Sequence, residues 1–127
     1  MRVTSEFYVT ALVRRIFADN GFAAISQKGS PEAGAIYIIV DRLDGSFDFY
    51  GPAPQAMFMA LPDGRLFEKL MSSVERDKIT ERVSREARMD PDFWVVEIEA
   101  REGAVDLPLV EEEGDKPSTP EDNFFKN

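Results

Sequence analysis

Residues 34–54 read GAIYIIVDRLDGSFDFYGPAP, and this stretch decides the fold. Two runs of β-forming residues flank Asp44-Gly45, and a proline-rich segment follows them. Asp-Gly between two such runs is a strong signal for a β-hairpin with a type I′ turn, in which both central residues have positive φ. Residues 35–40 are apolar on both alternating faces, which predicts a central strand covered on both sides.

A first helix is predicted before this hairpin. Thr4 or Ser5 can cap it, and Asn20-Gly21 is a typical helix end. Six residues recur at helical spacing and form one broad apolar face: Tyr8, Val9, Leu12, Val13, Ile16 and Phe17. A modest strand is expected over residues 22–28, so the helix has a sheet on which to pack.

The second half of the chain predicts an edge strand, a helix and a strand. Residues 65–71 alternate as an edge strand does, and a helix over residues 74–89 is capped by Ser72 or Ser73. The apolar stripe of this helix is thin and consists of Ile79, Val83 and Ala87. The last strand, residues 93–100, has two distinct faces. One face carries Trp94, Val96 and Ile98, and the other carries Phe93, Val95, Glu97 and Glu99.

These elements predict an α+β fold. We expect an antiparallel sheet of about four to six strands with two helices packed on it. The chain has 127 residues, a length typical of one domain. We assign residues 1–110 to this domain and residues 111–127 to an acidic tail of disordered composition, in which Phe124-Phe125 is the expected anchor.

The composition excludes several kinds of chemistry. The chain has no cysteine and no histidine, which rules out disulfides, thiol chemistry, Cys-ligated zinc and a Ser-His-Asp triad. A net charge of −9 would repel a nucleic-acid backbone. No run approaches the roughly 20 apolar residues of a membrane span. We therefore expect a cytoplasmic protein with no cofactor, no metal, no nucleic acid and no membrane partner.

Short motifs support a resemblance to a known family. They are Arg42-Leu-Asp-Gly45, Gly51-Pro-Ala-Pro54, Asp90-Pro-Asp-Phe-Trp-Val-Val-Glu-Ile-Glu99 and the Arg14-Arg15 pair in the first helix. In this order the motifs resemble the small bacterial proteins grouped as domain of unknown function 1491. The resemblance covers roughly residues 2–102. It implies a bacterial cytoplasmic protein, it carries over no activity, and the acidic tail lies outside its pattern.

Four charged residues are the candidates for ligand or partner binding: Arg14, Arg15, Glu86 and Glu97. Arg14 or Arg15, at the margin of the first helix, is expected to face Glu86 or Glu97 across the open side of the sheet. A guanidinium suits a carboxylate, and a half-buried carboxylate needs a cation. The simpler interpretation is that both arginines are solvated and that Glu97 lies at an exposed acidic strand end.

Two functions remain open at this point. The preferred one is a non-enzymatic protein-binding or regulatory module that acts on a basic partner surface and can form a homodimer. The alternative is a small enzyme or small-molecule-binding domain that uses arginine and carboxylates in a cleft between helix and sheet. A closed polar pocket would favour the alternative, whereas an exposed apolar patch would favour the binding module.

Overall fold

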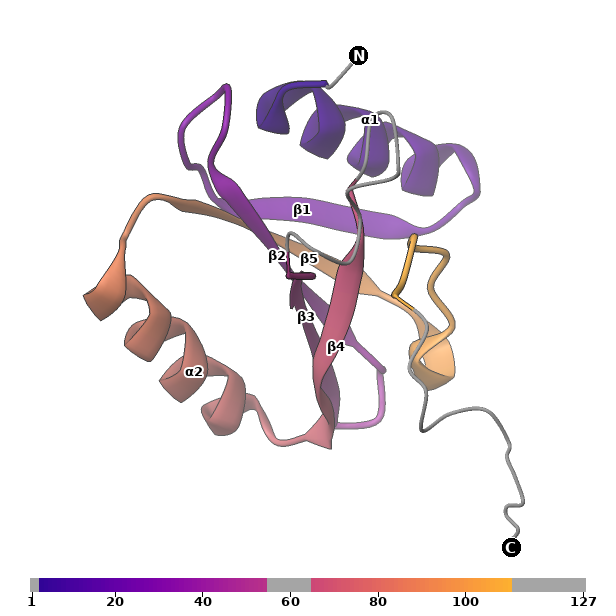
Figure 1. Ribbon diagram of the computed structural model, residues 1–127. Coiled ribbons are helices and arrows are strands. Elements are labelled where there is room, and N and C mark those ends of the chain that lie inside the picture. Colours follow the sequence, from indigo (N-terminus) through magenta and orange to yellow (C-terminus); the bar gives the residue numbers. More distant parts are fainter. Residues whose placement is uncertain (1–2, 55–64, 111–127) are drawn as a thin grey trace, which may run out of the picture.

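A computed structural model describes residues 3–54 and 65–110 (Figure 1). Residues 55–64 and the tail with Phe124-Phe125 lie outside these ranges. The elements are, in chain order, α1 (Ser5–Ala18), β1 (Phe22–Gln27), β2 (Ala35–Asp41), β3 (Phe47–Pro52), β4 (Phe67–Val74), α2 (Arg76–Met89), β5 (Phe93–Glu99) and a short 3₁₀ turn, η2 (Arg101–Gly103). Within the described ranges, neither α-helix is long and apolar enough to cross a membrane.

The α+β prediction is confirmed, but the sheet is mixed. The five strands have the order β1-β5-β2-β3-β4. Three neighbouring pairs are antiparallel, whereas β2 and β5 are parallel, with Ala35 opposite Phe93 and Asp41 opposite Glu99. Parallel neighbours need a long crossover, and the segment from β3 through α2 supplies it. Local periodicity carries no information about this pairing.

The central position of β2 is confirmed. Ile36, Ile38 and Val40 belong to a buried cluster that includes Val9 and Leu12 of α1. Ile39, on the other face of β2, belongs to a second cluster with Phe49, Ile79, Phe93 and Val95. The two helices therefore cover opposite faces of the sheet, as Figure 1 shows.

Both helices form near the predicted positions. Thr4 caps α1, because its hydroxyl oxygen accepts a hydrogen bond from the Phe7 N–H at 3.1 Å. The second helix begins later than expected, at Arg76, with Glu75 as its N-cap. Ser72 and Ser73 do not cap it, because β4 continues through both residues to Val74. As predicted, β4 is an edge strand and α2 buries a narrow stripe centred on Ile79.

The hairpin between β2 and β3 is confirmed, but its turn is not of type I′. Positive φ occurs at Leu43 (66°) and Gly45 (90°), and not at Asp44. The Asp44 carboxylate accepts hydrogen bonds from the Ser46 N–H at 2.9 Å and the Ser46 hydroxyl at 2.6 Å. Aspartate commonly folds a turn by such local bonds, and here they replace the two-residue reversal with a longer loop between Asp41 and Phe47.

Candidate functional site

The four predicted binding residues are not brought together. Arg15 lies on the α1 side of the sheet, where its Nη2 donates to the Asp106 carbonyl at 3.0 Å, and Arg14 is exposed on the same helix. Glu86 and Glu97 lie on the α2 side. The expected pairing across the sheet therefore does not occur, because two helices on opposite faces cannot share one cleft. A role in binding for these residues remains a prediction.

Glu86 helps to hold α2 on the sheet. Its carboxylate accepts hydrogen bonds from Arg82 Nε at 2.8 Å and from the Tyr37 hydroxyl of β2 at 3.1 Å. The bond from Arg82 is the main reason that the pKa of Glu86 is lowered. Burial, together with the charge of Glu86, raises the pKa of Tyr37 to about 12. Tyr37 also stacks on Phe49 at a centroid distance of 5.5 Å, so this contact joins the helix to the core.

A buried charge cluster holds the far edge of the sheet together. Asp48 of β3 is fully buried and contacts Arg42 Nη1 at 3.1 Å and Lys69 Nζ at 3.8 Å. Its other carboxylate oxygen accepts the Ser73 N–H at 2.8 Å. Ser73 has a φ of 54°, and β4 shifts register there, which turns this N–H toward Asp48. A Cβ on Gly103 would lie 2.6 Å from both Arg42 Nη1 and Asp48 Oδ2.

We interpret the Asp48 cluster as structural. It is closed over by Gly103 and joins β3, β4, the hairpin loop and η2, so a ligand has no way to reach the carboxylate. The sequence pattern predicts the strand but not the cluster. The available signal was the position of Asp48 between Phe47 and Phe49, which places it on the same face as buried Tyr50.

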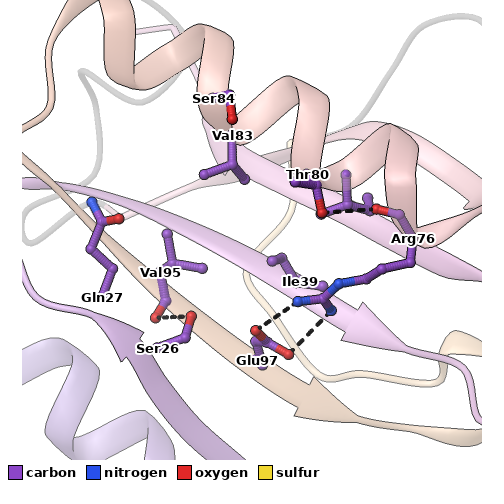
Figure 2. Close-up of a pocket in the computed structure, with 10 residues that line it drawn as sticks. Ser26, Gln27, Ile39, Arg76, Thr80, Val83, Ser84, Val95 and Glu97 are labelled. Carbon is purple, nitrogen blue, oxygen red and sulfur yellow. Dashed lines mark hydrogen bonds and ion pairs between the residues drawn. The ribbon is translucent and has the colours of Figure 1, made fainter.

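An open cleft lies between α2 and the sheet (Figure 2). Its volume is about 280 Å³. Arg76, Ile79, Thr80, Val83 and Ser84 of α2 form one wall, and Ile39, Val95, Glu97, Ser26 and Gln27 of the strands form the other. The interior is aliphatic, and polar side chains line the rim. Of the predicted binding residues, only Glu97 lines this cleft.

The polar groups of the cleft bond mainly within the protein. Arg76 reaches from the start of α2 to Glu97, with N–O distances of 3.3 and 3.2 Å, and Figure 2 shows this bridge at one end of the cleft. At the β1 side, Ser26 donates to the Val95 carbonyl and Gln27 to the Phe93 carbonyl. The register shift between Ile25 and Gln27 explains why two successive residues of β1 line one cleft.

The outer edge of β1 carries exposed apolar side chains. β1 is the last strand of the sheet, and Phe17, Phe22 and Ile25 beside this edge have 50%, 46% and 36% of their surface exposed. Phe17 and Phe22 pack edge to face at 5.7 Å. Neither the edge position of β1 nor this patch is predictable from the sequence pattern, because both depend on which strands pair.

The described residues offer little for a metal ion. Among residues 3–54 and 65–110, no group of three Asp or Glu side chains is placed to hold one. The site chemistry described here therefore consists of an apolar edge, a small amphipathic cleft and paired surface charges.

Comparison with known proteins agrees with this α+β fold, in which a mixed sheet carries one helix on each face. Residues 3–107 match the family model described as "Protein of unknown function (DUF1491)". The chain belongs to this family, and the predicted resemblance is confirmed. A search of the curated proteins gave no significant match.

Solved structures of related bacterial proteins are similar. The solution structure of protein Atu0922 from A. tumefaciens is 43% identical, with a TM-score of 0.76, over 88% of this chain and 98% of that protein. The crystal structure of a DUF1491 family protein from Caulobacter crescentus is 31% identical, with a TM-score of 0.69, over 87% and 100%. The NMR structure of a DUF1491 family protein from the same organism has a TM-score of 0.68 at 31% identity, over 87% and 99%.

We predict that Tyr37→Phe lowers stability at neutral pH and flattens its alkaline decline. Loss of the hydrogen bond to Glu86 should cost about 1 kcal/mol. In the wild type the folded pKa of Tyr37 is raised, so its contribution is complete below pH 10 and is lost as pH rises toward about 12. Urea unfolding between pH 7 and pH 12 measures both effects. An alkaline decline equal to that of the wild type would contradict the prediction.

We predict that Asp48→Asn strongly destabilises the fold. The substitution leaves Arg42 and Lys69 without their buried counter-charge, which should cost about 3 kcal/mol. Asp106→Asn is the control, because the Asp106 side chain is 99% exposed and its contact with Arg15 is 3.9 Å long. Surface changes of this kind usually stay within about 0.5 kcal/mol. Urea unfolding that finds both variants equally stable would show that the Asp48 cluster does not anchor the sheet.

Proposed function

We propose that this protein is a non-enzymatic binding module of the bacterial cytoplasm that takes an extended segment of a protein partner at the outer edge of β1. The observation that carries the proposal is that an uncharged, partly apolar strand lies at the edge of the sheet. An edge strand presents backbone N–H and C=O groups to which a further strand can add. In the part of the chain that the structure describes, no strand pairs with this side of β1.

The two edges of the sheet differ in the way that this proposal requires. Edge strands are usually protected by charges, bulges or a covering segment. The opposite edge strand, β4, has all three: it carries Glu68 and Lys69, it shifts register twice against β3, and Phe67 bonds to the backbone of Pro108 and Val110. β1 has no charged residue, whereas each of the other four strands has at least one. Its one register shift leaves Phe22–Ile25 regularly paired with β5.

The exposed apolar side chains point to a protein partner. Phe17 and Phe22 pack together as an apolar patch where α1 ends and β1 begins, and exposed Ile25 lies farther along β1. An apolar patch beside a free strand edge is typical of a protein-binding surface. The chain has a net charge of −9, and exposed Asp19 and Glu99 lie beside this patch. Charge complementarity therefore favours a partner segment with basic residues at its ends.

The alternative, a small enzyme or small-molecule-binding domain, has weaker support. Its natural site would be the cleft under α2, whose volume of about 280 Å³ is just below the roughly 300–1,000 Å³ of typical ligand pockets. Arg76 and Glu97 neutralise each other there. Glu86, the other predicted carboxylate on this face, is engaged by Arg82 and Tyr37. We therefore prefer the binding module.

We predict that Ile25→Lys weakens partner binding at least tenfold. A lysine in β1 protects the edge and repels a basic segment. Leu43→Lys is the matched control, because Leu43 is also an exposed apolar residue and the change adds the same charge in the distant hairpin loop. Partners would be captured on full-length protein from a lysate of the source cells, identified, and titrated in purified form against the wild type and both variants.

Three results would contradict this proposal or part of it. A partner that binds the Ile25→Lys and Leu43→Lys variants equally well would exclude the β1 edge. A lysate that yields no partner sensitive to Ile25→Lys would do the same. If the full chain instead dimerises in analytical ultracentrifugation and Ile25→Lys abolishes the dimer, the occupant of the edge is a second copy and the basic-partner proposal is wrong.

A further inference from the structure

We infer that the cleft under α2 is the specificity pocket of the β1 edge and takes one large apolar side chain of the added strand. This inference rests on the proposed function. Its structural basis is that β1, the strand to which the partner would add, itself forms one side of the cleft through Ser26 and Gln27. The edge and the cleft are therefore continuous parts of one surface.

The geometry of strand addition places a partner side chain at the mouth of the cleft. A new strand would lie about 4.8 Å outside β1, and alternate side chains would project toward the face that α2 covers. On that face β1 offers the short Ser26 and the folded-back Gln27, whose amide donates to the Phe93 carbonyl at 2.9 Å. A long side chain that passes over these two residues would point toward Val83 of α2, which Figure 2 shows on the opposite wall of the cleft.

The chemistry of the cleft selects an apolar occupant. Its interior consists of the aliphatic side chains of Ile39, Ile79, Val83 and Val95. At the far end, Arg76 and Glu97 bond to each other, so the cleft offers no uncompensated charge to a charged side chain. Burying such a side chain without a partner would be costly.

The size of the cleft suits one such occupant. Its volume of about 280 Å³ leaves room for one large apolar side chain of an added strand. The expected partner motif is therefore a short extended segment with one large apolar residue and with basic residues beside it.

The test uses a displayed library of random nine-residue peptides, selected on the full-length chain. We expect the selected peptides to share one large apolar position with lysine or arginine near it. The affinity of one selected peptide is then measured for the wild type and for Ser84→Trp, which fills the cleft from an exposed position on α2. Ser84→Trp should weaken binding at least tenfold. Met89→Trp, at an exposed site of the same helix outside the cleft lining, should not.

A double-mutant cycle distinguishes the pocket from the edge. Replacing the apolar residue of the peptide with alanine should weaken binding to the wild type at least tenfold, and should have little further effect on Ser84→Trp. If Ile25→Lys weakens binding but Ser84→Trp and the alanine peptide do not, the pocket inference is wrong and the edge proposal stands. If no peptide is selected, or if Ile25→Lys has no effect, the proposed function itself is contradicted.

Discussion

The burial of β2 on both faces is the constraint on which the rest of the structure depends. A strand with Ile36, Ile38 and Val40 on one side and Ile39 on the other must be covered by one layer above and one below. The described residues form two α-helices with apolar faces, and each helix covers one side of the sheet. This division also separates the charged side chains of the two helices. Arg15 therefore bonds to Asp106, whereas Glu86 bonds to Arg82 and Tyr37.

The parallel pairing of β2 with β5 determines which strands are left at the edges. With β5 placed beside β2, its other side is free to pair with β1, and β1 becomes the end of the sheet. The hairpin on the other side of β2 makes β4 the opposite end. The Asp48 cluster and the backbone of Pro108 and Val110 secure β4. β1 has no comparable cover in the described part of the chain, and this asymmetry is the main argument for a docking function.

The sequence pattern predicts the features that depend on local periodicity. The two faces of β5, the apolar face of α1 and the central position of β2 each follow from which residues alternate or recur within one segment. The predicted type I′ turn is wrong, because the Asp44 side chain accepts hydrogen bonds from Ser46 and a longer hairpin loop forms. The order of the strands is not predictable from local patterns, because the β2–β5 pairing joins segments that are far apart in the sequence.

The candidate site was predictable only in part for the same reason. Glu97 is a predicted binding residue, and it does line the cleft. Its partner Arg76 is not predicted, because no local pattern links the start of α2 to the middle of β5. The β1 edge was missed because an edge is defined by the absence of a neighbour. Nothing within FAAISQ distinguishes an outer strand from an inner one, except that the segment has no charge.

Amide hydrogen exchange of the full-length chain, alone and with a bound partner segment, tests the central claim most directly. We expect the β1 amides that point away from β5 to exchange quickly in the free protein, while those of β2 and β5 are protected. Binding of the partner should then protect the same β1 amides. Outward amides of β1 that are already protected in the free monomer, or that stay unprotected when the partner is bound, would contradict the claim that this edge is the docking site.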